Sequence, residues 1–481
     1  MERIKDWRSY QKILNRGRKR RFNIRAPYHD HVILKTIGFS FIFALVVIGG
    51  FKLFSFTRDY YATAKESGIG TGIKPLRLLK AEKILKVKTP KISNNPATTN
   101  FSLSALKKYF RKYPPEFTRI KNGRYIQKIG KYTVIYTLDP VVQKEAEKVF
   151  VRYNVPFGAL VAVDPETGAI LGYVTYARNK QEAGEISNLH RYRPGSIVKV
   201  VTASAAIESK GFSPAFNIYF NGGLYGTNKN YWMQNINTGY NKISFKLAFA
   251  KSCDIAFGKI AGFYVGKNLL WQYFNKFYFN RKIPFIMGLK ESTARVPVKF
   301  YSLELTGAGF KNVRITPILA SLISATVVNG GKLLEPYIIK EVIGSGGKVY
   351  YRHTGVKILS NPITAYTANI LKQMMMATVV SGIGRPDFYN GYNQYLLPGI
   401  LTGGKTGTIS GKNPTGLYQW FTGFGEEGNK KIAIAALVVE HPIWQITGGG
   451  VSEKVLYSYF FKNNNEGKNL SHKRNVKLAQ R

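Results

Sequence analysis

The stretch ALVAVDPETGAILGYVT, residues 159–175, carries the strongest fold signal in the chain. Two apolar runs flank a Pro-Glu-Thr-Gly turn, a pattern typical of antiparallel strands joined as a β-hairpin. Three more strand-like runs come much later, at 399–408, 418–424 and 432–440. Helical patterns lie between these strands, at 196–209, 243–265, 316–328 and 365–380. We therefore predict an α+β fold in which distant parts of the chain complete one antiparallel sheet, with helices packed on it and a helical insertion.

The N-terminal region is predicted to anchor the chain in a membrane. Residues 1–31 hold ten Lys or Arg against three Asp or Glu, and residues 36–51 (TIGFSFIFALVVIGGF) hold no charge. The lysines on both sides of this core can snorkel, which extends the apolar segment to residues 32–56. This segment is long enough to span a bilayer, which takes about 20 residues. The basic flank places 1–31 in the cytoplasm and the chain from about residue 57 outside. A buried core helix or a cleaved signal peptide is the alternative, but no Ala-x-Ala cleavage site follows.

The remaining chain divides by composition into three parts. Residues 57–132 form a basic juxtamembrane linker or short pedestal, 133–461 a folded domain, and 462–481 a basic disordered tail. With 44% apolar residues, the chain is not disordered as a whole. We expect a protein of the inner or plasma membrane with a cytoplasmic N-terminus and the folded domain in the periplasm or outside the cell.

The charge of the chain predicts anionic partners. The formal net charge is +45, of which +25 stays on residues 101–461 after the tails, the linker and the lysines flanking the anchor are subtracted. Such a surface binds polyanions, so anionic membrane lipids or wall polymers are expected partners. Nucleic acid is not, because the basic body is expected on the far side of a membrane. The chain has one cysteine, Cys253, and six histidines without the HExxH spacing of a metal site. We therefore predict no disulfide framework, no metal and no cofactor.

Ser196 and Lys199 are the first candidate catalytic residues. The segment RPGSIVK, 193–199, lies where a loop turns into an apolar helix. A serine hydroxyl there is near the positive end of the helix dipole, and a lysine three residues on lies on the same face, where it can act as a base. The spacing alone is not specific, because Ser-x-x-Lys recurs at 104–107 and 345–348. The alternative is that Ser196 only caps the helix and Lys199 is a solvated surface lysine.

Two further clusters support a catalytic interpretation. The segment KSCD, 251–254, follows an apolar run, and GGKTGT, 403–408, ends a strand-like run before an aromatic strand. A lysine, hydroxyls and glycines on a strand edge suit the docking of an extended peptide and its carboxylate. A similar His-Thr-Gly at 353–355 lies in a charged run, and we expect no functional role for it.

In chain order, SIVK (196–199), SCD (252–254) and KTG (405–407) resemble the three active-site motifs of penicillin-binding proteins and serine β-lactamases. The hairpin, RPGSIVK, ITPILASLISATVVNGGKLLEPYI and GGKTGT extend the resemblance to the transpeptidase domain over roughly 133–461. It implies a five-stranded antiparallel sheet with helices on both faces, a helical subdomain, and an active-site cleft between the two. It also implies that Ser196 is the acylated nucleophile, Lys199 its base and Ser252 a proton relay.

The resemblance implies that the strand residues Lys405, Thr406, Gly407 and Thr408 contact the substrate, and that the backbone N–H groups of Ser196 and Thr408 form the oxyanion hole. Asp254 is the fourth catalytic candidate and departs from the pattern, since most of the family has Asn there. Elongation-type class B enzymes often carry this Asp, but their large pedestal does not fit into 57–132. We expect Asp254 to be ionised, because surrounding lysines should hold the pKa of its carboxyl down.

The implied function is that of a monofunctional, membrane-anchored peptidoglycan D,D-transpeptidase, which cross-links stem peptides and is acylated by β-lactams. No glycosyltransferase domain fits before the transpeptidase region. A β-lactamase is disfavoured because Glu166 lies in the hairpin turn and cannot be the deacylating base. A D,D-carboxypeptidase, or a wall sensor or scaffold that binds penicillin without turnover, remains an alternative. Cell-wall elongation or division proteins are further expected partners.

Overall fold

The computed structural model describes residues 102–462, apart from 186, 227, 236–237 and 441–443. The predicted cytoplasmic tail (1–31) and anchor (32–56) lie outside this part, as do most of the linker and the tail from residue 463. Within the described part, no helix has the length and apolar character needed to cross a bilayer.

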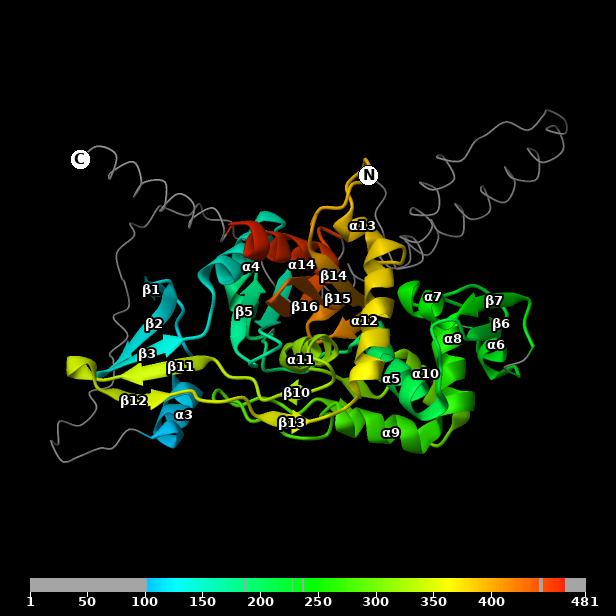
Figure 1. Cartoon of the computed structure of the whole chain (residues 1–481), viewed down its shortest axis with the longest axis horizontal. Helices are drawn as coiled ribbons and strands as arrows, with labels where there is room; N and C mark the ends of the chain where they lie inside the picture. The colour runs from blue at the N-terminus through cyan, green and yellow to red at the C-terminus, as the bar shows by residue number, and fades with distance from the viewer. Residues whose placement is uncertain (1–101, 186, 227, 236–237, 441–443, 463–481) are drawn as a thin grey trace, which may run out of the picture. The chain divides into compact units, whose positions relative to one another are not determined.

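A five-stranded antiparallel sheet forms the centre of the fold (Figure 1), as the hairpin and the three later strand-like runs predict. The strand order is β14-β15-β16-β4-β5. The hairpin of β4 and β5 therefore joins the sheet through β4, which pairs with β16, the last strand of the described residues. Its strands are β4 (Phe157–Val163), β5 (Ile170–Ala177), β14 (Leu401–Lys412), β15 (Thr415–Glu427) and β16 (Lys430–Glu440). Every residue of β4 is buried, which explains its continuous apolar sequence.

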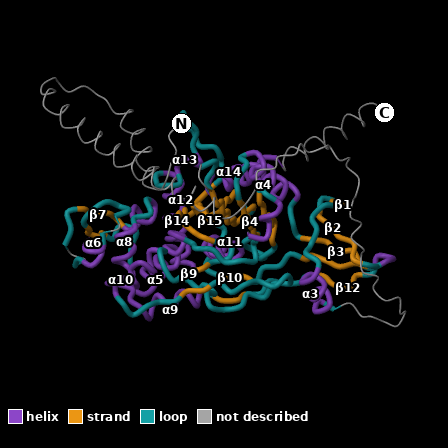
Figure 2. The backbone as a smooth tube through the Cα atoms, turned by 180° about the vertical axis from the view of Figure 1, so that it is seen from behind, coloured by secondary structure: helices purple, strands orange, loops and turns teal. Residues whose placement is uncertain are grey.

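Helices cover both faces of this sheet (Figure 2). Successive residues of β4 point to opposite faces, and Leu160 and Val161 accordingly belong to two different buried clusters. One face packs on α11 (Pro317–Val328), which is buried along its whole length. The other face packs on α4 (Pro140–Arg152) and α14 (Gly448–Tyr457). Asp139 caps α4 by accepting hydrogen bonds from two backbone N–H groups, and Pro140 begins the helix.

A helical region lies beside the β14 edge of the sheet (Figure 1). Its helices are α5 (Lys199–Lys210), α6 (Lys229–Met233), α7 (Phe245–Ala250), α8 (Asp254–Lys259), α9 (Gly266–Lys276) and α10 (Phe300–Ala308), and α12 (Ala365–Val380) joins it to β14. Short strands β6 (Asn217–Phe220) and β7 (Asn241–Ser244) form a hairpin here, and β8 (Thr293–Ala294) pairs with β9 (Val313–Arg314). The single helix predicted over 243–265 is wrong: the chain breaks between α7 and α8 and continues as a π-helix, Ile260–Val265.

A second five-stranded sheet, in the order β1-β2-β3-β11-β12, is built from two distant segments of the chain. Its strands are β1 (Arg119–Lys121), β2 (Arg124–Ile129), β3 (Tyr132–Tyr136), β11 (Ile339–Ile343) and β12 (Val349–Arg352). The helix α3 (Leu103–Lys112) precedes it, and β10 (Leu333–Leu334) pairs with β13 (Ile358–Ser360) nearby in sequence. The boundary expected between residues 132 and 133 therefore falls inside β3, after the first residue of that strand, and within one sheet.

Candidate active site

The loop that carries Ser196 is fixed between the helical region and β14. Gly195 adopts a φ of +56° and opens a 3-10 turn, Gly195–Val198, which continues into α5. A Cβ at Gly309, whose φ is +97°, would lie 1.9 Å from the Gly195 carbonyl oxygen. Only glycine fits at 309, because a side chain there would overlap the main chain of the loop that carries Ser196.

Arg193 holds the same loop from the other side. Its guanidinium donates to the carbonyl oxygens of Ser410 at 2.6 Å and Phe310 at 2.7 Å, and its own carbonyl accepts from the Trp420 indole N–H at 2.9 Å. These bonds join β14, β15 and the loop after α10 to the segment that precedes Ser196. The sequence predicted no role for Arg193, Trp420 or Gly309. Arg193 belongs to the segment RPGSIVK, and that motif was the signal that could have pointed to it.

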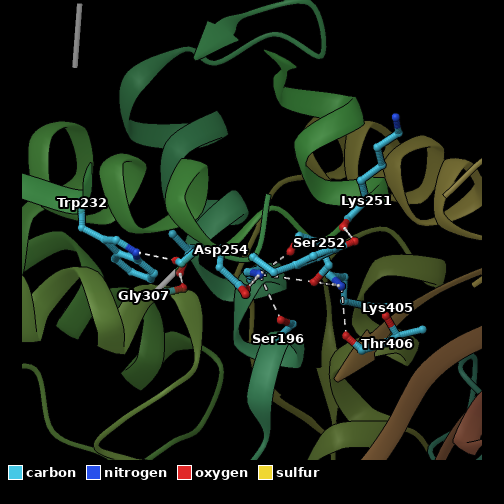
Figure 3. A network of polar contacts seen from close by, with 12 residues as sticks. Ser196, Trp232, Lys251, Ser252, Asp254, Gly307, Lys405 and Thr406 are labelled. Carbon is cyan, nitrogen blue, oxygen red and sulfur yellow. Dashed lines mark hydrogen bonds and ion pairs between the residues drawn. The ribbon is translucent and has the colours of Figure 1, made fainter. Parts of the chain in front are cut away.

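Lys199 is fully buried, and its ammonium lies at the centre of the candidate site (Figure 3). Its Nζ is 3.0 Å from Ser196 Oγ, 3.2 Å from Ser252 Oγ, 3.0 Å from the Ser252 carbonyl oxygen and 2.5 Å from Asp254 Oδ1. A buried cation is tolerated only with such partners. The Ser196 side chain is half-buried, so the nucleophile candidate remains reachable from one side.

Ser252 lies at the break between α7 and α8, in a left-handed conformation with φ +56°. Its hydroxyl is within hydrogen-bond distance of two buried lysines, Lys199 at 3.2 Å and Lys405 at 2.9 Å. Figure 3 shows the side chain of Lys251 pointing away from this cluster. A non-glycine residue with positive φ is strained, and here the strain places one hydroxyl between two ammonium groups.

Asp254 begins α8 and is buried beside Lys199. Burial raises the pKa of the Asp254 carboxyl, and the attraction of Lys199 and Lys405 only partly opposes this effect. The expectation that neighbouring lysines hold this pKa below its ordinary value is therefore wrong, because the sequence does not show how completely the carboxyl is removed from water.

The four predicted substrate-contact residues lie on β14, next to the Ser196 loop. Lys405 is fully buried; burial, followed by repulsion from Lys199, lowers the pKa of its ammonium well below the ordinary value. Thr406 is half-buried and its carbonyl accepts from Lys405 Nζ at 2.9 Å. A Cβ on Gly407 would lie 2.5 Å from the Pro194 carbonyl oxygen, and the Thr408 nitrogen lies 3.1 Å from an ideal Cβ of Gly195. The main chains of Thr408 and the Ser196 loop are thus in direct contact.

The other motif-like segments are not brought into this cluster. One Ser-x-x-Lys begins in α3, and the other begins in the 3-10 turn Ser345–Gly347 before β12. His353 follows β12 in the second sheet, where its ring stacks on Tyr337 with centroids 3.4 Å apart. Among the described residues, no three His, Cys, Asp or Glu side chains are grouped as metal ligands are.

Fold and site together define an α+β protein with a Ser–Lys pair beside the edge strand of an antiparallel sheet. The family model described as the penicillin binding protein transpeptidase domain matches residues 158–460, and the chain belongs to this family.

Curated relatives agree with this assignment. The chain is 25% identical over 345 residues to stage V sporulation protein D of Bacillus subtilis, covering 66% of this chain and 51% of that protein. It is 26% identical over 314 residues to the peptidoglycan D,D-transpeptidase PbpA of Mycobacterium tuberculosis, covering 58% and 61%. The chain thus spans only about half to three fifths of these relatives.

Solved structures share the fold. The crystal structure of PBPA from Mycobacterium tuberculosis matches with a TM-score of 0.55 and 24% identity, over 68% of this chain and 80% of that one. The imipenem acyl-enzyme complex of the same protein matches with a TM-score of 0.56 and 23% identity, over 68% and 79%.

Proposed function

We propose that this protein is a membrane-anchored peptidoglycan D,D-transpeptidase that works through an acyl-enzyme on Ser196 and is inhibited covalently by β-lactams. The observation that carries the proposal is the position of Lys199 Nζ, within hydrogen-bond distance of both Ser196 Oγ and Ser252 Oγ. Support comes from the family, from a relative named as a D,D-transpeptidase, and from matching structures described as β-lactam acyl-enzymes.

In the proposed acylation, Ser196 Oγ attacks the carbonyl carbon of the terminal D,D-peptide bond of a donor stem peptide. Lys199 in its neutral form takes the hydroxyl proton, as a base adjacent to a serine nucleophile does. The backbone N–H groups of Ser196 and Thr408 stabilise the oxyanion, a contribution of about 3 kcal/mol for each donor. Collapse of the tetrahedral intermediate breaks the peptide bond, and the leaving amine takes its proton through Ser252.

In the second half of the reaction, the amine of an acceptor stem peptide attacks the ester carbonyl. Its proton returns through the lysine to Ser196 Oγ, which leaves as the regenerated hydroxyl. Lys405, with Thr406 and Gly407 beside it, and Thr408 on the same edge strand hold the extended donor peptide, because a strand edge offers main-chain hydrogen bonds. Asp254 positions Lys199 through their 2.5 Å ion pair.

The test is mass spectrometry of the full chain after reaction with penicillin G. We expect one adduct of the antibiotic's mass on the peptide that contains Ser196, and none in a Ser196→Ala variant with an unchanged circular dichroism spectrum. Ser104→Ala, which alters another Ser-x-x-Lys serine, is the matched control and should retain labelling. An adduct elsewhere, or none, would refute the acyl-enzyme. A donor peptide released only to water, even with acceptor amine present, would make the enzyme a carboxypeptidase.

The proposed location follows from the basic flank and apolar segment at 32–56, which place the catalytic domain outside the cytoplasm. A reporter that is active only outside the cytoplasm should work when fused after residue 481. Activity of a cytoplasmic reporter alone would exclude a wall substrate. Anionic wall polymers and cell-wall elongation or division proteins remain proposed partners.

A further inference from the structure

A cavity of about 550 Å³ lies outside the Ser196 site, between α3 and the loop that follows α9. None of the candidate catalytic or substrate-contact residues lines it. Its volume lies within the range of about 300–1,000 Å³ that is usual for small-ligand sites. It is therefore large enough for a molecule of several rings or polyol units and is not merely a packing defect.

The rim of the cavity is basic and carries no acidic side chain. Its ionisable lining residues are Lys107 and Arg111 on α3, His190 in the loop before Ser196, and Lys282 and Lys290 after α9. No ion pair among the described residues uses any of these five side chains. Four permanent cations converge on one cavity without a carboxylate to neutralise them, and such an arrangement favours an anion of more than one negative charge.

His190 lies among the cations that line the cavity. Its imidazole is half-buried on the cavity wall, and burial together with repulsion from Lys290 lowers its pKa. Lys290, Lys282, Lys107 and Arg111 are the charged groups that line the cavity with it. A bound anion would oppose the repulsion from Lys290 and would therefore raise the pKa of His190.

The floor of the cavity is apolar. Phe285, Ile283 and Leu289 are buried beneath the cations, and the Phe285 ring lies 6.3 Å from the Tyr173 ring of β5. A free inorganic anion gains nothing from such a floor, whereas the C–H face of a sugar or polyol removes water from it. Arg111 adds a planar donor fork, which matches phosphate in geometry.

We propose that this cavity is a second ligand site, which binds a phosphate ester carried on a sugar or polyol. The phosphate lies among the rim cations, and the carbohydrate lies on the floor around Phe285. The ligand has two possible sources, a small sugar phosphate or the phosphodiester backbone of a wall polymer. The site does not depend on the proposed acylation at Ser196.

The test is isothermal titration of the full chain in detergent with glucose 1-phosphate, inorganic phosphate, glucuronate and an isolated phosphodiester wall polymer. We expect one site per chain, with glucose 1-phosphate binding at least tenfold more tightly than inorganic phosphate or glucuronate. Lys282→Gln with Lys290→Gln should weaken binding at least tenfold, and so should Lys107→Gln with Arg111→Gln, a second variant whose substitutions lie on α3. Lys242→Gln with Lys246→Gln removes equal charge from exposed positions elsewhere and should change affinity less than twofold.

A histidine signal makes the site itself observable. In protein labelled with ¹³C at histidine, and with His190→Asn to assign the resonance, saturating glucose 1-phosphate should raise the pKa of His190 by half a unit or more. Tight binding by the polymer alone, lost in the cavity variants, would identify the polymer as the source. Equal losses in the cavity and control variants, equal affinity for glucuronate, or no binding by either phosphate ester would overturn the proposal.

Discussion

Asp254→Asn removes one formal charge from the centre of the site while keeping its shape. Asn retains an oxygen in the position of Oδ1, so Lys199 Nζ keeps a hydrogen-bond acceptor at about the same place as the 2.5 Å contact. Both partners are buried, with side-chain exposures of 0% for Lys199 and 11% for Asp254. The variant therefore separates the effect of the carboxylate charge from the effect of packing.

The size of the effect follows from the ion pair. An opposite charge within about 4–6 Å typically shifts a pKa by about one to three units, and one pH unit corresponds to about 1.4 kcal/mol. Removing the carboxylate removes the negative charge that holds a proton in the site, so proton abstraction from Ser196 should reach its full rate at lower pH. We expect the basic rise of the acylation rate to move down by about one to two pH units.

The assay is the second-order rate of acylation by a chromogenic β-lactam between pH 5 and 10. Because burial raises the pKa of Asp254, its carboxyl is protonated over a wider acidic range than that of a free Asp. The two proteins should therefore converge at low pH and separate as pH rises. Asp387→Asn changes another carboxyl, which is half-buried and accepts a hydrogen bond from Thr447, and is the matched control. An unchanged profile, or a shift to higher pH, would refute the coupling of Asp254 to Lys199.

Three further predictions concern the scaffold around the site. Glu304 is buried with both carboxyl oxygens unpartnered among the described residues, and its pKa is raised to about 8. Its protonated form is thus favoured by folding, and stability should fall as pH rises from about 5 to 8, by at most about 4 kcal/mol. Glu304→Gln should flatten that fall in a thermal melt, and an equally steep fall would contradict the assignment. Gly309→Ala should lower the free energy of unfolding in urea by more than about 2 kcal/mol, because its Cβ meets the Gly195 carbonyl, whereas Gly211→Ala, with open space around it, should cost about 1 kcal/mol. Arg193→Lys should slow acylation about tenfold without unfolding the protein, since one ammonium cannot replace a guanidinium that bridges two carbonyl groups; wild-type rates would show that the bridge does not position Ser196.

The central sheet was predictable because its signals are local. Residues 159–175 combine two apolar runs with a turn, and β16 is a continuous apolar run because it is buried on both faces. The second sheet was not predictable in the same way. Its strands β1 and β2 are short and rich in Lys and Arg, and they join the sheet of β11 and β12 only through β3. Pairing between such distant segments is decided by tertiary packing, which local patterns do not contain.

The candidate site shows the same division between local and tertiary information. The spacing of Ser196 and Lys199 predicts one helix face, and the structure brings their side chains within 3.0 Å. The break before Asp254 follows no local signal, since 243–265 has a continuous helical pattern. Ser252 adopts its left-handed conformation where two buried lysines from other elements meet its hydroxyl.

Two buried lysines, Lys199 and Lys405, share the site with one carboxylate, Asp254. Lys199 and Lys405 are both fully buried and contact the same hydroxyl, so their charges repel each other without water to screen them. Asp254 makes its ion pair with Lys199 alone, and Lys405 is left as the cation whose pKa falls well below its ordinary value. If the proposed substrate brings its own terminal carboxylate to Lys405, it supplies the counter-charge that the protein lacks there. Binding of the donor peptide would then favour protonation of Lys405, and protonation of Lys405 would favour binding of the donor peptide. Asp254 neutralises the charge of Lys199, so Lys199 does not take part in this coupling.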